Sequence, residues 1–123
     1  MKAVVLEKTC NADELKVSEV EIPKVKDGWV LVRVLGFGIN RAEVILRDYE
    51  ADEYYIELPV IPGIECVGEV VDSSNTRFKN GDKIAALMGG MGRSFDGGYA
   101  KSLWRQEGIL YFSRVFDRQI IVK

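Results

Sequence analysis

The chemistry open to this sequence is limited first by the residues that it lacks. The chain contains no histidine, which excludes a Ser-His-Asp triad, a Cys-His pair and any metal motif built on two histidines within it. Its two cysteines, Cys10 and Cys66, lie far apart in the sequence and match no zinc-ribbon or redox motif. The plain interpretation is two buried free thiols. We therefore expect no metal site within the chain.

Two glycine-rich segments invite comparison with phosphate-binding loops. Gly36-Phe37-Gly38 follows an apolar run and precedes a helical pattern, as the glycines of a dinucleotide-binding motif do. The third glycine position holds Arg41, whose side chain obstructs the close packing of helix on strand that glycine permits. The segment 89–92 (Gly-Gly-Met-Gly) has no Lys-Ser/Thr after it and is therefore not a P-loop. We expect a flexible loop there, whose backbone freedom could also admit a ligand.

Short strands must position most of these residues. Val30, Val32 and Val34 alternate with positions that admit Arg33, which predicts a strand with one apolar face. Similar runs with turn signals between them are typical of a barrel or sandwich. The predicted strands are Met1–Glu7, Leu15–Ile22, Trp29–Phe37, Ile64–Val71, Lys83–Met88, Gly98–Trp104, Ile109–Phe112 and Gln119–Val122.

One segment, from Asn40 to about Tyr49, has the periodicity of a helix instead. Asn40 can cap its N-terminus, and Glu43 stands where a capping box requires a carboxylate. The apolar positions of one face are Ala42, Ile45, Leu46 and Tyr49. Residues 48–57 then carry five acids and no base, which indicates a solvated loop whose tyrosines could line the mouth of a pocket.

Length and composition limit the protein class. The chain has 123 residues, of which 47% are hydrophobic and 29% charged, and its net charge is −2. These values favour one globular domain and predict neither a nucleic acid nor a membrane as partner. No apolar run is long enough to span a membrane, and the first residues lack the layout of a signal peptide. We therefore expect a cytoplasmic protein.

Four motifs in a distinctive order carry a family resemblance. The central one is residues 58–71, Leu-Pro-Val-Ile-Pro-Gly-Ile-Glu-Cys-Val-Gly-Glu-Val-Val, with residues 38–43 before it and residues 78–84 and 97–100 after it. Together they resemble the N-terminal, GroES-like domain of the medium-chain dehydrogenase/reductase superfamily, over about residues 1–112. The resemblance implies a mainly β fold, a partly open β-barrel with one or two short helices, and no Rossmann domain.

The resemblance also implies candidate site residues. Zinc-dependent members have a cysteine ligand at the position of Asn40 and a histidine ligand at the position of Ile64, so this sequence is similar to the zinc-free quinone oxidoreductases. In those enzymes a hydride passes from NADPH to a quinone or activated alkene, and hydrogen-bond donors must stabilise the oxyanion. Asn40 would then lie near the nicotinamide and the substrate carbonyl, although an N-cap asparagine needs no other role. Glu65 matches the family's acidic position, and Arg47 and Tyr49 are further candidates for the substrate cleft.

Full members of the superfamily bind NAD(P)H in a second, Rossmann domain, whose fingerprint this sequence lacks. We expect a truncated chain that binds no cofactor by itself and is inactive alone. Residues 113–123 diverge from the family, and Gln119–Val122 could add a closing strand. A homodimer could form through the face that a Rossmann domain would cover. Two alternatives stay open: a half-enzyme that recruits a separate Rossmann polypeptide, and a non-catalytic binding or scaffold domain.

Overall fold

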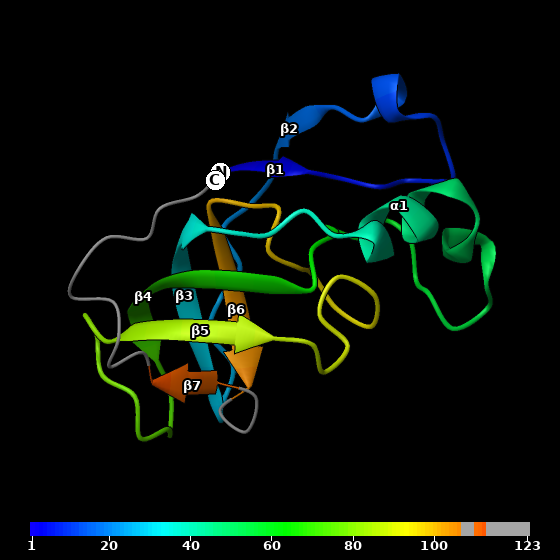
Figure 1. Cartoon of the computed structure of the whole chain (residues 1–123). Helices are drawn as coiled ribbons and strands as arrows, with labels where there is room; N and C mark the ends of the chain where they lie inside the picture. Colours follow the sequence, from blue (N-terminus) through cyan, green and yellow to red (C-terminus); the bar gives the residue numbers. More distant parts are fainter. Residues whose placement is uncertain (107–109, 113–123) are drawn as a thin grey trace.

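The computed structural model describes residues 1–106 and 110–112, and this part of the chain folds mainly as antiparallel β-structure (Figure 1). The strands form a two-stranded sheet, β1-β2, and a five-stranded sheet in the order β6-β3-β4-β5-β7. Their bounds are β1 Lys2–Val4, β2 Val17–Glu19, β3 Trp29–Gly36, β4 Glu65–Ser73, β5 Lys83–Leu87, β6 Ser102–Gln106 and β7 Leu110–Phe112. The predicted mainly β fold is confirmed, with sheets that remain open instead of closing into a complete barrel.

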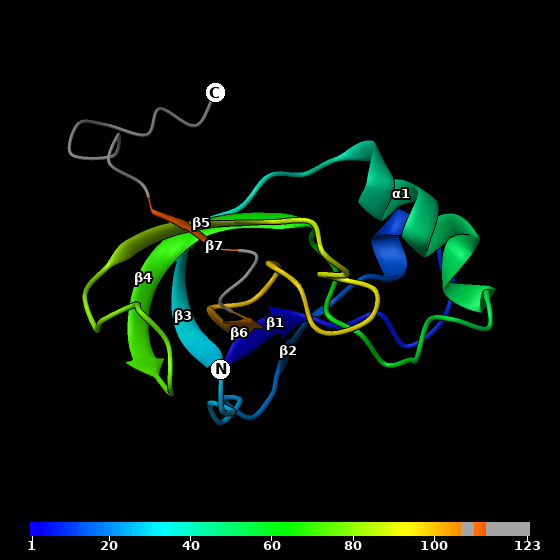
Figure 2. The same cartoon turned by 90° about the horizontal axis from the view of Figure 1, so that it is seen from below.

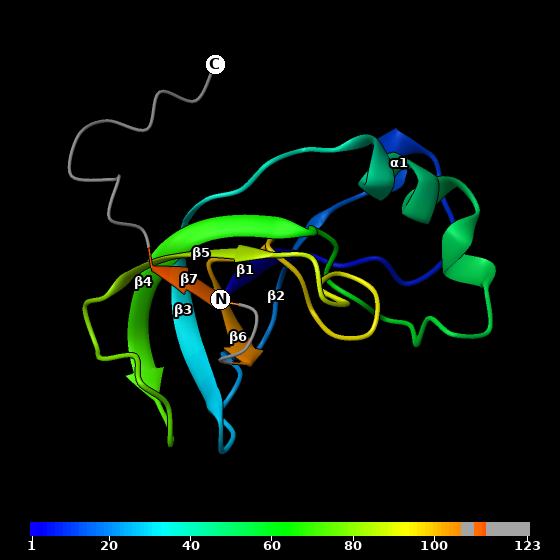
Figure 3. The same cartoon turned by 60° about the horizontal axis from the view of Figure 1, so that its bottom comes forward.

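The alternation predicted for β3 decides which side of the larger sheet forms the core. Val30 and Val32 are fully buried, Leu31 between them is also buried, and Arg33, which follows Val32, is exposed. The sheet curves strongly, as the bent ribbons of β3 and β4 show (Figures 2 and 3). Its concave side is filled by a cluster of buried apolar residues, namely Val30, Val32, Cys66, Val70, Phe78, Ile84, Ala86 and Met91. Cys66 is thus a buried thiol, as the sequence predicts, whereas Cys10 is only half-buried.

The smaller sheet joins the larger one through the segment before β6. Val4 donates its backbone N–H to the Tyr99 carbonyl at 2.9 Å, and Lys101 donates to the Lys2 carbonyl at 3.1 Å. An isolated bridge also pairs Ala3 with Ala100. These contacts place Tyr99 between the two sheets. Each pairing among the strands β1–β7 is antiparallel, so this part of the chain contains no β-α-β unit.

The predicted helix is present as α1, Arg41–Asp48, and Asn40 is its N-cap. Its fully buried Leu46 packs into a second apolar cluster with Leu6 and Val60. Two single turns of 3-10 helix, η1 Ala12–Glu14 and η2 Glu50–Asp52, are the other helical elements of the described residues. The prediction that Tyr49 extends the apolar face is wrong, because α1 ends before it and its side chain is 62% exposed.

The glycine-rich loop after β5 is held to the rest of the molecule instead of standing free. Met91 is buried in the core at 1% exposure, and Asp96 accepts a hydrogen bond from the Ile61 backbone N–H at 2.9 Å. Gly89, Gly90 and Gly92 all have positive φ angles, which explains the use of glycine there. The loop lies between the larger sheet and α1, as Figures 1 and 3 show.

Two sequence predictions lie outside the described residues: the divergent segment 113–123 and the closing strand Gln119–Val122. The domain boundary at residue 112 therefore stays a prediction. In the described part of the chain, no helix has the length and apolar character needed to cross a membrane.

Candidate functional site

Antiparallel pairing of β3 with β4 brings two distant motifs together. Gly36, at the end of β3, pairs with Val67 in β4. Because the two strands run in opposite directions, the residues after Gly36 must lie beside the residues before Val67. Gly38 and Asn40 therefore meet Glu65, although these motifs are separated by the whole of α1 and η2. This junction is the candidate site.

Asn40 and Glu65 are in direct contact. Asn40 Nδ2 donates a hydrogen bond to Glu65 Oε1 at 3.1 Å, and both residues are half-buried. Gly38 leaves the space in which the Glu65 carboxylate lies, since a Cβ at position 38 would stand 1.9 Å from Glu65 Oε1. An ionised carboxylate only accepts hydrogen bonds, so it fixes the orientation of the Asn40 amide, with Nδ2 toward Glu65.

Among residues 1–101, Glu43 is the one buried charged residue, at 6% exposure. Its Oε2 accepts the Asn40 backbone N–H at 2.7 Å, and its Oε1 accepts the Ile64 backbone N–H at 3.1 Å. These bonds compensate the burial of the carboxylate, which would otherwise be costly. The first turn of α1 also favours a negative charge at this position.

Tyr99 closes the site from the segment before β6. Its ring packs against Phe37 with a centroid separation of 4.7 Å, and its hydroxyl oxygen is buried. No group of the described residues lies in hydrogen-bonding geometry with this hydroxyl. Burial, and secondly the nearby negative charge of Glu43, raise the pKa of Tyr99 far above its ordinary value. The hydroxyl is therefore neutral at physiological pH.

Arg93 links the glycine-rich loop to the helical region. Its Nε and Nη2 bond the Glu50 carboxylate, the shortest contact being 2.6 Å, and Nη2 also donates to the Ala42 carbonyl at 3.0 Å. Tyr55 donates its hydroxyl to the same carboxylate. The hydrogen bond from Arg93 is the main cause that lowers the pKa of Glu50, and the bond to Glu50 raises the pKa of Arg93. The ion pair thus joins the loop to η2, and the bond to the Ala42 carbonyl joins it to α1.

Arg47 and Tyr49, the other two predicted cleft residues, lie away from this junction. They stand at the C-terminal end of α1, and seven residues of helix separate Arg47 from Asn40 by about 10 Å along the axis. Arg47 Nε bonds Asp48 at 3.0 Å, and Tyr49 is exposed. The structure therefore brings Asn40 and Glu65 together, but it does not bring Arg47 or Tyr49 to them.

An apolar pocket opens on the outer side of the sheet beside this junction. It measures about 240 Å³ and is lined by Gly36, Phe37, Gly38, Glu65, Cys66, Val67, Ala85 and Leu87. Glu65 therefore belongs both to the Asn40 pair and to the wall of the pocket. A small, flat, apolar ligand suits such a lining, with the polar groups at its edge.

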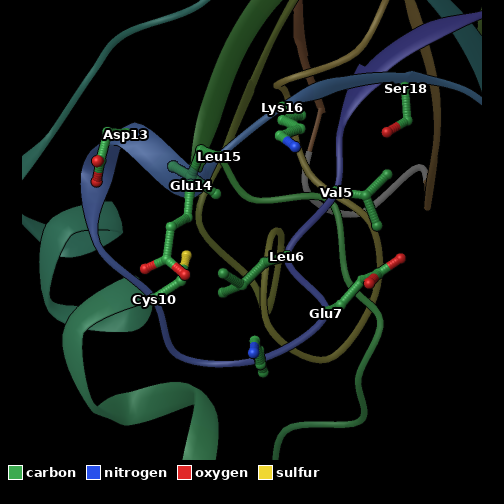
Figure 4. A pocket seen from close by; sticks show the side chains of 10 residues that line it. Val5, Leu6, Glu7, Cys10, Asp13, Glu14, Leu15, Lys16 and Ser18 are labelled. Carbon is green, nitrogen blue, oxygen red and sulfur yellow. The ribbon is translucent and has the colours of Figure 1, made fainter.

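A larger pocket of about 420 Å³ lies elsewhere, between residues 5–10 and 13–18 (Figure 4). Leu6 stands in its middle, and charged side chains such as Lys16 and Glu7 surround it. None of the predicted site residues lines it. Glu14 is already bonded to the Asn11 backbone N–H. We therefore place the candidate site at the junction of β3 and β4.

The donor set of this junction does not suit a catalytic zinc ion. Zinc binds thiolates, imidazoles and carboxylates, whereas Asn40 has an amide side chain and Ile64 a hydrocarbon one. Within residues 1–106 and 110–112, no three His, Cys, Asp or Glu side chains lie close enough together to hold a metal ion. The described strands also lack the β-α-β crossover that usually binds a dinucleotide.

Comparison with known proteins decides the family. The family described as the alcohol dehydrogenase GroES-like domain matches residues 26–111. The chain belongs to this family. Sorbitol dehydrogenase of Bacillus subtilis (strain 168) is 34% identical over 92 residues, which are 72% of this chain and 25% of that protein. Quinone oxidoreductase of Sus scrofa is 29% identical over 96 residues, 76% of this chain and 27% of that protein.

Solved structures agree on the fold of this GroES-like chain. A quinone oxidoreductase from Pseudomonas syringae pv. Tomato DC3000 superposes with a TM-score of 0.79 at 23% identity, covering 95% of this chain and 34% of the other. At that identity the likeness concerns the fold alone. The chain thus spans about a quarter to a third of the length of these relatives.

Two residues of the site gain roles that the sequence interpretation did not give them. The capping-box spacing identified Glu43, but only as a local partner of Asn40. Tyr99 lies in the 97–100 motif that carries the resemblance, but that motif gave no sign of its buried hydroxyl. A signal for Glu43 did exist, because it stands three residues before Leu46, on the same buried face of α1.

Proposed function

We propose that this chain is the substrate-side domain of a zinc-independent oxidoreductase that reduces a quinone or an activated carbonyl or alkene. The observation that carries the proposal is the hydrogen bond from Asn40 to Glu65, which orients the amide. An amide nitrogen has two hydrogens. One is donated to Glu65, and the other is available for a carbonyl oxygen placed against the pocket beside Gly38 and Phe37.

The arrangement suits stabilisation of a developing oxyanion. A donor that is already oriented needs no reorganisation when negative charge forms on a substrate oxygen. The apolar wall of Phe37, Val67 and Leu87 lowers the local polarity and strengthens such a bond. Zinc independence is part of the proposal and is supported by the amide and hydrocarbon at positions 40 and 64.

The proposal assigns the hydride donor to a site outside the described residues. The relatives are three to four times longer than the segment that they share with this chain, and an NAD(P)H site in the intact family belongs to the part that this chain does not match. We therefore infer that the chain by itself neither binds NAD(P)H tightly nor turns over substrate.

We also propose a second copy of the chain as partner, through the face around the apolar pocket. Ile39 is 80% exposed and Phe37 43% exposed there, and Leu87 contributes a further exposed apolar side chain. Contiguous exposed apolar groups of this kind favour association. A two-fold axis would let the same face serve both copies.

The acceptor role of Asn40 can be tested without any cofactor. Tetramethyl-1,4-benzoquinone, which has no free ring carbon for a thiol to attack, is titrated into the ¹⁵N-labelled chain and followed by NMR. We expect saturable shifts at residues 36–40 and 64–66, and about fivefold weaker binding in Asn40→Ala because one hydrogen bond is lost. Asn11→Ala, which removes the asparagine of the distant η1 turn, should bind as the wild type does.

Two outcomes of this titration contradict the proposal. If the wild type and Asn40→Ala bind the quinone with equal affinity, the Asn40 amide does not contact the quinone. Shifts confined to the pocket of residues 5–18 would place the quinone elsewhere. Either result would favour the alternative of a non-catalytic binding or scaffold domain, in which Asn40 serves only as a helix cap.

A further inference from the structure

The capping pattern Asn-x-x-Glu occurs twice in the chain, and the two occurrences have different surroundings. Asn11 to Glu14 opens η1, and Asn40 to Glu43 opens α1. In each, the glutamate Oε2 accepts the backbone N–H of the asparagine at 2.7 Å. The pair therefore offers an internal comparison between a glutamate that only caps and one that has a further contact.

Glu14 shows what capping alone requires. It is exposed, and its carboxylate bonds within its own turn. Glu43 is buried at 6% exposure, and its second oxygen accepts the Ile64 backbone N–H, 21 residues further along the chain. Burial of a carboxylate is unfavourable, and capping does not demand it. The feature that distinguishes the buried Glu43 from the exposed Glu14 is therefore its hydrogen bond from the Ile64 backbone N–H. This bond connects the start of α1 to the residue before β4.

We propose that Glu43 is a positioning residue that holds the Asn40 amide against Glu65. Its two oxygens accept hydrogen bonds from the backbone N–H groups of Asn40 and Ile64, and Ile64 immediately precedes Glu65. One carboxylate thus sets the separation of the two backbone segments whose side chains meet at 3.1 Å. This role rests on the proposed function, in which the oriented Asn40 amide is the working group.

The surroundings of Glu43 fit a fixed, charged carboxylate. Arg93, on the glycine-rich loop, donates hydrogen bonds to the Ala42 carbonyl and to Glu50. The Arg93 guanidinium therefore does not take the place of the backbone N–H groups that bond Glu43. The buried hydroxyl of Tyr99 lies near Glu43, whose negative charge is, after burial, the next cause that raises the pKa of this hydroxyl. The backbone N–H groups of Asn40 and Ile64 each bond one of the two Glu43 oxygens.

Glu43→Gln and Glu14→Gln form the matched test, with NMR of the ¹⁵N-labelled chain as the readout. A glutamine keeps the size but turns one oxygen into a donor, so at most one of the two N–H contacts of Glu43 survives. We expect hydrogen exchange at the Ile64 amide to become about tenfold faster in Glu43→Gln. The Asn40 Nδ2 resonances should move toward those of a solvated asparagine side chain. Glu14→Gln should change neither signal.

The Asn40 side-chain signal separates positioning from stability, because a purely structural role would lower the melting temperature and leave that signal in place. Glu43→Asp keeps the charge at the helix start but is one methylene shorter, so it can bond Asn40 or Ile64 and not both. If Glu43→Gln does not fold, Glu43→Asp provides the same test of positioning through the Asn40 Nδ2 resonances. Unchanged Asn40 Nδ2 resonances in the folded variant would overturn the proposal. Because no ligand is added, this outcome is independent of quinone binding.

Discussion

At the scale of single residues, the position of Glu65 depends on the absence of a side chain at Gly38. In Gly38→Ala the new Cβ would meet Glu65 Oε1 at 1.9 Å. The obstructing atom is the end of a flexible side chain, so we expect the protein to fold with the carboxylate turned away and the Asn40–Glu65 bond lost. NMR of the Asn40 side-chain amide measures this loss directly.

Gly36→Ala is the control for this substitution. A Cβ at position 36 makes only an ordinary contact of 3.6 Å, with Val67, and should leave the Asn40 amide signal as in the wild type. An unaltered Asn40 signal in Gly38→Ala would show that the space at position 38 does not determine where Glu65 lies.

Tyr99 gives the site a signature at alkaline pH. The pKa of its hydroxyl is raised in the folded state, mainly by burial, so the unfolded chain loses this proton at lower pH than the folded chain does. The contribution is present below pH about 10 and is lost as pH rises further. We expect the free energy of unfolding to fall more steeply between pH 9 and about 11.5 in the wild type than in Tyr99→Phe. Urea denaturation at several pH values tests this, and parallel curves would contradict it.

Individual contacts of this site were only partly predictable from the sequence. The family pattern singled out Asn40 and Glu65, and the structure brings them within 3.1 Å. Their contact depends on the register in which Gly36 pairs with Val67, and no local rule gives a register between strands so far apart. Arg47 and Tyr49 are near Asn40 in the sequence, but the rise of the helix separates them from it along the axis.

At the scale of elements, α1 is held in place by the loop that follows β5. Arg93 is the connecting residue, and both it and Glu50 are largely buried, at 19% and 18% side-chain exposure. Arg93→Lys retains the charge but loses the paired geometry of the guanidinium. We expect it to lower the free energy of unfolding by about 2 kcal/mol, measured by urea denaturation.

Arg33→Lys is the matched substitution on the surface. Arg33 pairs with Glu69 at 3.2 Å, but its side chain is 56% exposed, and we expect a change below about 0.5 kcal/mol. Equal effects of the two substitutions would mean that the Arg93 ion pair does not anchor the loop.

The elements themselves were the most predictable level. Alternating valines identified β3, and the spacing of apolar residues together with Asn40 and Glu43 identified α1. The anchoring of the glycine-rich loop was not predictable, because glycine content reports backbone freedom and says nothing of a distant carboxylate. Only the folded structure places Glu50 within reach of Arg93.

At the scale of the whole molecule, the exposed apolar face beside the site predicts self-association. Sedimentation velocity over a range of concentrations should show a dimer in the wild type and a monomer in Ile39→Lys, where a charge enters the 80%-exposed position. Tyr54→Lys alters an even more exposed position, at 97%, away from this face and should leave the dimer intact. A monomer at every wild-type concentration would contradict the proposed partner.

The central claim is that this chain carries the acceptor side of the family's reaction and not its cofactor site. Calorimetric titration with NADPH, followed by a quinone reduction assay in the same sample, tests that claim most directly. We predict no saturable binding tighter than about 100 μM and no turnover. Saturable binding below that value, together with quinone reduction, would contradict it, because the chain would then hold the cofactor without a β-α-β unit among its described strands.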